Sequence, residues 1–295
     1  MPASIDYHEA AHGQWRLVYL GELWNRGAQQ AVLEMVEAQP WAKHPQTLPL
    51  RLTLGAKEHE LYLKVFHPGR GAAAWKDALR RSKAWRAWRL GLELENAGFA
   101  VPFTIAAGEQ RRARFLRRAF LLTEKIDGEP APLFLRAWLH CGKNKARLAA
   151  KRAGLRHAAR LVRRFHRAGF VHGDLVASNL LVAFDGHAMN FYFMDNDRTR
   201  RYPVWPAQPF WKRNLIQLNR LPLPGVTLQD RMRFLKAYLD IGKVSAGERS
   251  LARWLERRTR LRREQCDGVD GSGDFRRLMH WSGEISPTAD PKELR

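Results

Sequence analysis

The segment 170–198 holds the residues best suited to chemistry. His172 and Asp174 are followed five positions later by Asn179, and Asp195 ends an apolar run sixteen residues further on. Carboxylate and amide oxygens are hard ligands of the kind that Mg²⁺ takes, and a carboxylate can also accept or orient the proton of a hydroxyl. Phosphoryl transfer needs both, because metal charge must neutralise the phosphate oxygens. The pattern therefore predicts Asp174 beside an acceptor hydroxyl, with Asn179 and Asp195 as magnesium ligands.

A lysine upstream of this segment is placed where it could bind nucleotide phosphates. Lys64 lies inside the apolar run Leu-Tyr-Leu-Lys-Val-Phe, which has the composition of a strand. The alternative is an edge-strand lysine exposed to solvent. Because its ammonium group is a compact point charge, we expect Lys64 to hold the α- and β-phosphates.

Arginines directly after Asp195 are candidates for binding the acceptor. Arg198, Arg200 and Arg201 follow the predicted metal loop, where a substrate would dock. A guanidinium group can bind a phosphate or a carboxylate through two hydrogen bonds. Asp197 has two interpretations, a second metal ligand or, more simply, a loop residue paired with Arg198.

Hydrophobic periodicity predicts the elements that must position these residues. Gly128 and Pro130 break the chain and predict a hinge, with a first domain over 1–125 and a second over 126–295. The expected elements are a β-hairpin over 49–66 that turns near Gly55, a helix over 73–97, strands after Val101 and over 119–124, an amphipathic helix over 145–168, strands over 179–184 and 190–194 that turn at Asp185 and Gly186, basic helices over 212–264, and a loosely structured tail from 267 to 295.

Composition limits the class of protein. The formal charge is +22 with a sequence pI near 10.8, and 45% of the 295 residues are hydrophobic. We therefore expect a folded cation that binds a polyanion: nucleic acid, an anionic lipid surface or a phosphorylated substrate. Two cysteines, no secretory signal and no apolar run approaching 18 residues predict a cytoplasmic protein without a membrane span.

The pattern His-Gly-Asp-Leu-x-x-x-Asn-Leu-Leu, followed by an apolar strand and Asp, resembles the catalytic and metal loops of the protein-kinase-like fold. Gly after the His is similar to small-molecule kinases such as the aminoglycoside and choline kinases. Further stretches resemble the bacterial lipopolysaccharide core kinases, which phosphorylate Kdo or heptose. These stretches span about 60–240 and include LYLKVF, RRSKAWRAW, AGFAVP, FLLTEKIDGE and FYFMDNDRTRR.

The resemblance implies an α+β, two-lobed fold, with a small antiparallel-sheet N-lobe and a mostly helical C-lobe. By it, Asp174 would be the catalytic base, and the backbone from Glu124 to Ile126 would meet the adenine. Glu93 is the candidate partner of Lys64 and Glu95 the runner-up. The sequence departs from the family pattern in two respects: no G-x-G-x-x-G loop precedes Lys64, and no Glu in the helix 73–97 is an obvious partner for it.

The expected activity is therefore transfer of phosphate from ATP, with Mg²⁺, to a Kdo or heptose hydroxyl of the lipopolysaccharide inner core. The expected partners are a lipid A core precursor and the anionic inner-membrane surface, with the protein a monomer bound peripherally at the cytoplasmic face. Nucleic acid is not expected, because the sequence has no zinc-finger, RRM or KH signature. The alternatives are a protein or small-molecule kinase of the same fold and a pseudokinase scaffold.

Overall fold

The computed structural model describes residues 6–139, 145–184, 188–203, 210–220 and 226–267. The chain divides into two compact units. The first contains Met1–Asp127 and Tyr192–Thr199, and the second contains Gly128–Phe191 and Arg200–Arg295. A division of the domains at residue 125 stays a prediction. No pattern in the sequence predicts that Tyr192–Thr199 belongs with the first unit.

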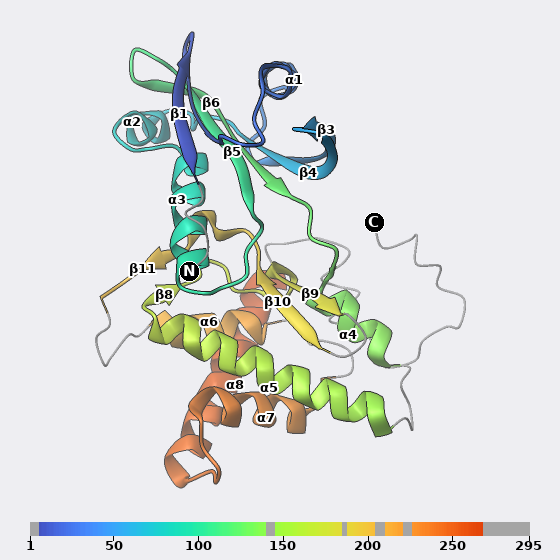
Figure 1. Ribbon diagram of the computed structural model, residues 1–295. Coiled ribbons are helices and arrows are strands. Elements are labelled where there is room, and N and C mark those ends of the chain that lie inside the picture. Colours follow the sequence, from blue (N-terminus) through green and yellow to red (C-terminus); the bar gives the residue numbers. More distant parts are fainter. Residues whose placement is uncertain (1–5, 140–144, 185–187, 204–209, 221–225, 268–295) are drawn as a thin grey trace. The chain divides into compact units, whose positions relative to one another are not determined.

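The first unit is built on a six-stranded antiparallel sheet (Figure 1), with strand order β1-β2-β5-β6-β4-β3. Its strands are β1 (Tyr7–His12), β2 (Trp15–Leu20), β3 (Gln46–Leu54), β4 (Lys57–Phe66), β5 (Thr104–Arg112) and β6 (Phe115–Glu124), and its helices are α1 (Arg26–Ala38), α2 (Ala72–Ala78), α3 (Lys83–Asn96) and the 3₁₀ turn η2 (Asn196–Arg198).

The predicted hairpin over 49–66 is confirmed as β3 and β4, which begins three residues earlier than expected. Gly55 makes the turn with φ +61°, a conformation that glycine adopts without steric cost. Strand β4 then pairs with β6 on its other side, so Lys64 lies in a central strand. The alternative of an edge-strand lysine is therefore wrong.

The two faces of the sheet are covered by different helices. In β2, Leu17 packs in a core cluster with Val32 and Val36 of α1, whereas the next residue, Val18, packs with Trp85 and Trp88 of α3. Successive side chains of a strand point to opposite faces, so α1 and α3 lie on opposite sides of the sheet. Both clusters are almost fully buried.

The helix predicted over 73–97 is two helices, α2 and α3, separated by residues 79–82. Ser82 is the N-cap of α3, and its hydroxyl accepts a hydrogen bond from the backbone N–H of Trp85. A serine at this position satisfies a donor that the first turn of a helix leaves free. The apolar spacing runs through the break, which is why periodicity alone missed it.

The second unit is mostly helical (Figure 1), as expected from its basic, periodic sequence. The helix predicted over 145–168 is confirmed as α5, and the strand pair as β9 and β10, while the turn at Asp185 and the tail after 267 lie outside the described residues. Its elements are β7 (Glu129–Pro130), α4 (Ala131–Leu139), α5 (Lys145–Arg167), β8 (Phe170–Val171), η1 (Ala177–Asn179), β9 (Leu180–Phe184), β10 (Met189–Phe193), β11 (Arg200–Arg201), α6 (Phe210–Leu218), α7 (Leu228–Leu239) and α8 (Ala246–Asp267).

Helix α5 packs against α7 and buries small and apolar residues that include Ala158, Val162 and Phe165. The strands form a three-stranded sheet in the order β10-β9-β7, and β8 pairs with β11. In the part of the chain that the structure describes, no helix is both long and apolar enough to cross a bilayer.

Candidate functional site

The first unit brings Lys64 of β4 and Asp195 together as an ion pair between Lys64 Nζ and Asp195 Oδ1. The two residues are 131 positions apart. The Lys64 side chain is 22% exposed and that of Asp195 is 44% exposed, so both groups can reach a ligand from solvent. A cation suited to phosphate and a carboxylate suited to metal are therefore neighbours.

The pairing of Lys64 with Glu93 stays a prediction. Within the described residues, neither Glu93 nor the runner-up Glu95 forms an ion pair or hydrogen bond with Lys64. One Glu95 oxygen is buried without a hydrogen-bond partner among those residues. Burial raises the pKa of Glu95 to about 7. The Lys64 ammonium group is instead paired with the Asp195 carboxylate.

The turn at Gly55 is too far from Lys64 to cradle phosphate. In the β3–β4 register, Leu54 pairs with Lys57 at the turn, whereas Lys64 pairs with Thr47. Seven residues of extended strand separate the two positions, which is roughly 24 Å. The hairpin turn therefore takes no part in a site built on Lys64.

The loop that carries Asp195 has a strained but well-supported backbone. Asp195 has φ +54° and ψ +50°, the left-handed conformation that aspartate tolerates better than most residues. The next residue, Asn196, donates a side-chain hydrogen bond to the carbonyl of Phe193 (2.7 Å) and accepts one from the backbone N–H of Thr199 through its own carbonyl (3.0 Å). These contacts hold the loop so that the carboxylate faces β4.

A second carboxylate, Asp197, lies in the same loop. Burial raises the pKa of Asp197, and the negative charge of Asp195 raises it further. The positive charges of Lys64, Arg198 and Lys83 act in the opposite direction. The Asp197 Oδ1 is buried and has no hydrogen-bond partner among the described residues. Among the described residues, Asp197 forms no ion pair with Arg198, so the expected pair is wrong, although the Arg198 charge still acts to lower the pKa of Asp197.

These two carboxylates fit a magnesium ion, whose protein sites often have only one or two carboxylates and are completed by phosphate and water. The unpartnered Asp197 oxygen is the kind of acceptor that a cation would satisfy. Within the described residues, no group of three or more His, Cys, Asp or Glu side chains gathers as a metal site. Any ion here would therefore take its other oxygen ligands from the nucleotide or from water.

The segment after β6 leaves backbone groups for a planar ligand. The N–H of Glu124 donates to Phe103 (2.9 Å), and the N–H of Lys125 donates to Glu60 (3.0 Å). Within the described chain, the N–H of Ile126 has no such partner. A half-buried, unused donor at this position is compatible with the predicted contact between Glu124–Ile126 and adenine.

The second unit holds Asp174 and Asn179 together. The Asn179 amide donates to the Asp174 carbonyl (2.8 Å), which leaves the amide oxygen for a ligand. The Asp174 backbone N–H donates to His172 Nδ1 (3.1 Å), and Gln217 Nε2 donates to the Asp174 carboxylate (3.3 Å). His172 is 1% exposed, in agreement with a supporting rather than a proton-transferring role.

A buried polar chain fixes this loop to the helices behind it. Asn214 of α6, which is fully buried, accepts from the backbone N–H of His172 (3.0 Å) and donates to its carbonyl (2.6 Å). The same oxygen accepts from His166 Nε2 (3.0 Å), and Tyr238 contacts His166 Nδ1 (2.9 Å). Burial lowers the pKa of His166 to about 4, so its imidazole is neutral near neutral pH.

Sequence reasoning missed Asn214 and Gln217. Their stretch matched the family pattern, but neither residue was given a role. Their spacing could have indicated a role. Asn214 and Gln217 are three positions apart, so they share one face of the helix, next to buried Leu215. Uncharged amides on a core-facing stripe indicate a buried hydrogen-bond network.

Two of the three candidate substrate arginines lie next to the loop that carries His172 and Asp174. Arg200 and Arg201 form β11, which pairs with Val171 and Phe170 directly before His172. Both arginines are exposed, and Arg201 lies over the Phe170 ring at 5.3 Å. Arg198 is also exposed, but it belongs to the first unit.

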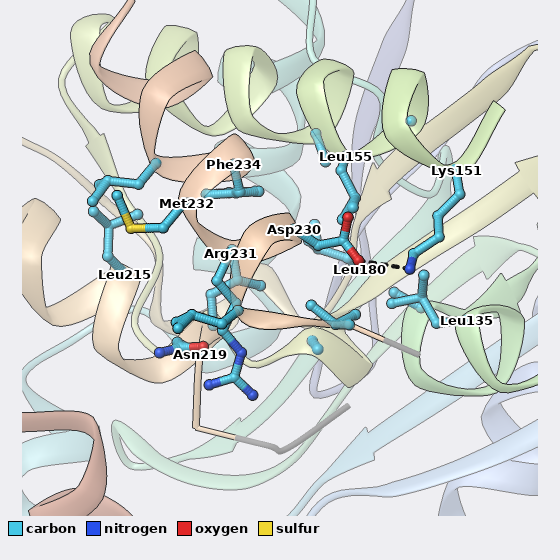
Figure 2. Close-up of a pocket in the computed structure, with 18 of the residues that line it drawn as sticks. Leu135, Lys151, Leu155, Leu180, Leu215, Asn219, Asp230, Arg231, Met232 and Phe234 are labelled. Atoms are coloured by element: carbon cyan, nitrogen blue, oxygen red, sulfur yellow. Dashed lines mark hydrogen bonds and ion pairs between the residues drawn. The ribbon is translucent and has the colours of Figure 1, made fainter. Parts of the chain in front are cut away.

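The second unit also contains an apolar cavity of about 370 Å³ (Figure 2). Leu135, Leu155 and Leu180 are among its lining residues, and Lys151 and Asp230 form an ion pair at its wall (2.7 Å). Asp230 is 3% exposed and also caps α7 through Thr227. No local sequence pattern predicts this cavity, because its lining comes from segments far apart in the chain.

Residues 51–238 match the model of the lipopolysaccharide kinase (Kdo/WaaP) family. A 3-deoxy-D-manno-octulosonic acid kinase of Stenotrophomonas maltophilia (strain R551-3) is 32% identical over 172 residues, 58% of each chain. The enzyme of that name from Xanthomonas campestris pv. campestris (strain B100) is 33% identical over 147 residues, 50% of this chain and 52% of that one. The chain thus spans about half the length of the curated relatives it matches.

A solved structure described as WaaP in complex with acyl carrier protein is similar in fold. It superposes with a TM-score of 0.58 and 23% identity, over 77% of this chain and 90% of that one. The predicted fold class is confirmed: an N-terminal antiparallel sheet is followed by a mostly helical part.

Proposed function

The chain belongs to the lipopolysaccharide kinase (Kdo/WaaP) family, and from that premise we propose that it transfers the γ-phosphate of ATP to a Kdo or heptose hydroxyl in the lipopolysaccharide inner core. The observation that carries this proposal is the Lys64–Asp195 ion pair. In this pair, a lysine suited to phosphate lies beside a carboxylate suited to a metal ion, and both belong to the matched segment.

Each predicted site residue has its own role in the proposed phosphoryl transfer. Lys64 binds the α- and β-phosphates, and Asp174 accepts the proton of the sugar hydroxyl while Gln217 holds its carboxylate in place. The hydroxyl oxygen bonds to the γ-phosphorus, the bond from that phosphorus to the β–γ bridging oxygen breaks, and ADP leaves with the electron pair. A magnesium ion, bound through Asn179 and Asp195, would supply positive charge to the phosphate oxygens.

The acceptor and its location follow from the relatives and from charge. The curated relatives are named for an octulosonic acid sugar, and the exposed Arg200 and Arg201 beside the catalytic loop suit an acidic or phosphorylated sugar. A lipid A core precursor is a polyanion, and the +22 chain would meet it at the anionic inner face of the membrane. We propose that the protein acts there as a peripheral monomer.

Mass spectrometry of core oligosaccharide, from cells with and without this protein, tests the activity. We expect loss of one phosphate, restored by the wild type and by Asp240→Asn but not by Asp174→Ala. Asp240 is an exposed aspartate of the second unit that pairs with Arg163, so it controls for a general loss of charge. Restoration by Asp174→Ala, or a core unchanged without the protein, would leave the proposal without support.

The alternatives give other results in purified form. A protein or small-molecule kinase would phosphorylate casein-type proteins or aminoglycosides in preference to core oligosaccharide. A pseudokinase scaffold would show no ATP hydrolysis and no thermal shift with ATP and Mg²⁺, whereas a ligand at 100 times its Kd adds about 2.7 kcal/mol.

Acyl carrier protein is a second candidate partner. The structural relative was solved with that protein, and the cavity of this chain has the apolar lining and the size of a small-molecule site. We propose that the cavity accepts a hydrocarbon chain delivered in this way. Comparing co-purification of acylated and unacylated carrier protein tests it, and equal capture of both forms would exclude a role for the cavity.

A further inference from the structure

An exposed apolar patch lies on the first unit, on a helix that contributes nothing to the core. No residue of α2 is buried. Trp75 is 66% exposed and Leu79 is 82% exposed, and the Trp75 ring meets the ring of Phe115, which is 36% exposed, edge to face at 5.2 Å. We call Trp75, Leu79 and Phe115 the α2 patch.

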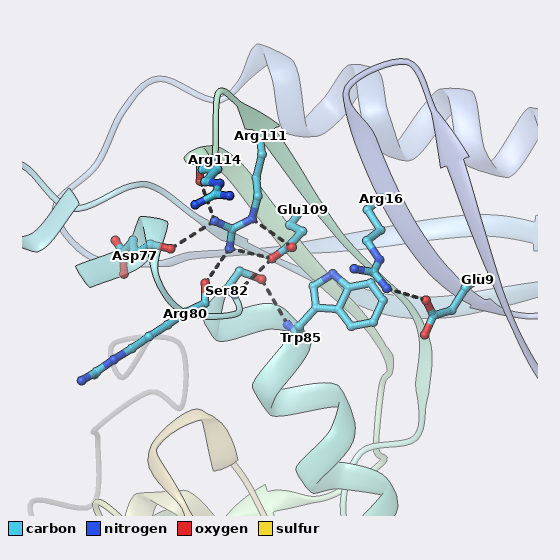
Figure 3. A network of polar contacts seen from close by, with 9 residues as sticks. All are labelled: Glu9, Arg16, Asp77, Arg80, Ser82, Trp85, Glu109, Arg111 and Arg114. Atoms are coloured by element: carbon cyan, nitrogen blue, oxygen red, sulfur yellow. Dashed lines mark hydrogen bonds and ion pairs between the residues drawn. The ribbon is translucent and has the colours of Figure 1, made fainter. Parts of the chain in front are cut away.

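A partly buried network holds the backbone at Asp77, Arg80 and Ser82, which flank Leu79 of this patch (Figure 3). The guanidinium group of Arg111 donates to the carbonyls of Asp77 (3.1 Å) and Arg80 (2.7 Å), and it pairs with the Glu109 carboxylate at 3.0 Å. Glu109 also accepts from the backbone N–H of Ser82 (3.0 Å). The carbonyls at the end of α2 are therefore fixed while its large side chains remain in solvent.

The surroundings of the α2 patch are strongly basic. Asp77 is the sole acidic residue between positions 61 and 92 of the sequence, and its carboxylate accepts from the N–H of Gly69 (3.0 Å). The exposed cations of this region form no ion pair with any residue that the structure describes. They are Lys76, Arg80, Arg81, Arg112 and Arg114.

We propose that the α2 patch is the surface by which the protein docks on an anionic lipid bilayer. Tryptophan suits the headgroup region because it has an apolar body and a polar N–H, and flanking Lys and Arg attract anionic lipids. Three apolar side chains are enough for an interfacial contact. The cations beside them are complementary to acidic lipid headgroups, whereas a second copy of this chain carries the same positive charge and would be repelled. The inference rests on the proposed function, because a kinase whose acceptor is a glycolipid must dock on the membrane that holds that glycolipid.

Sedimentation with vesicles of phosphatidylcholine containing 30% phosphatidylglycerol tests the surface. We expect salt-sensitive binding by the wild type, a loss of tenfold or more in Trp75→Ser/Leu79→Ser, and no change in Leu148→Ser, an exposed leucine of α5. Thermal unfolding should be unchanged, because no buried contact is removed. Binding of the double variant equal to that of the wild type would overturn the proposal.

A matched pair of charge variants separates this surface from general attraction. Each basic residue near an anionic membrane contributes about 1 kcal/mol, or about fivefold in affinity. Arg80→Gln/Arg81→Gln should therefore weaken binding about 25-fold, and Arg156→Gln/Arg160→Gln on α5 should have a much smaller effect. Equal effects would show that net charge alone binds the vesicle and would overturn the assignment of the surface.

Two further measurements separate this proposal from its rivals. Trp75→Ser/Leu79→Ser should phosphorylate delipidated core oligosaccharide at the wild-type rate, so failure of the kinase activity and failure of docking are distinguishable. Size-exclusion chromatography should give one molecular mass for wild type and variant. A dimer that the double variant abolishes would identify the patch as a contact between copies and overturn membrane docking.

Discussion

Lys64 and Asp195 form an ion pair within the first unit, although they are 131 positions apart in the chain. The lysine comes from a central strand, and the aspartate from a short segment that returns to this unit after most of β10. The resemblance implies Glu93, or Glu95 as the runner-up, as the partner of Lys64. In this structure a carboxylate of the predicted metal loop pairs with the lysine, so nucleotide binding would have to compete with or share this pair.

Replacing Lys64 tests the role of the pair. Lys64→Met should lower kcat/KM for ATP by about 10- to 150-fold, because a hydrogen bond to a charged group contributes about 1.5–3 kcal/mol. Lys64→Arg should recover part of the lost activity, because it keeps the positive charge. Recovery should be incomplete, because the planar guanidinium group differs in shape from the compact ammonium group. Lys57→Met, on the same strand but at the Gly55 turn, is the control and should behave as wild type. Normal turnover by Lys64→Met would exclude Lys64 from the site.

Gln217 positions the Asp174 carboxylate and should affect kcat more than KM. Gln217→Leu removes the 3.3 Å hydrogen bond and should lower kcat about tenfold with little change in KM for ATP. Gln217→Glu should be worse, because it puts a second carboxylate beside Asp174. Steady-state kinetics check both, with Arg213→Gln on the exposed face of α6 as the control. Equal loss in Leu and Glu variants, together with a lowered melting temperature, would indicate only a packing role.

The sequence predicted local features well and contacts between distant segments poorly. The β3–β4 hairpin and α5 follow from alternation and helical spacing, which are properties of neighbouring residues. The break between α2 and α3 was missed because Ser82 caps a helix within a continuous apolar pattern. The Lys64–Asp195 pair, the Asn214 network and the apolar cavity join segments far apart in the chain, and no local pattern encodes such meetings.

His166 should make the protein less stable in mild acid. Burial lowers the pKa of the folded-state imidazole to about 4, whereas the unfolded chain titrates near 6.5. Its contribution is therefore complete above pH 6.5 and is lost as the pH falls towards 4. The loss amounts to about 3 kcal/mol in the free energy of unfolding.

Denaturant unfolding of wild type and His166→Gln at pH 7, 5.5 and 4 measures this effect. The variant is less stable at pH 7, because it loses the contacts with Asn214 and Tyr238, but its stability should decline less steeply with acid. His157→Gln, an exposed histidine of the same helix, should follow the wild-type curve. Parallel curves for wild type and His166→Gln would show that His166 does not titrate across this range.

Glu95 should have the opposite pH dependence. Burial raises the pKa of its folded-state carboxyl to about 7, against about 4.5 when unfolded, so folding favours the protonated acid. Stability from this group is complete below pH 4.5 and is lost as the pH rises through 7. Glu95→Gln removes this cost and should raise the free energy of unfolding at pH 8. The gain should be only about 1 kcal/mol, because the carboxyl is half-buried and solvent screens part of the effect.

Glu93→Gln on the same helix is the control, and melting curves at pH 5 and pH 8 check both variants. A gain of equal size at the two pH values would mean that the glutamine improves packing or hydrogen bonding and that Glu95 carries no buried charge.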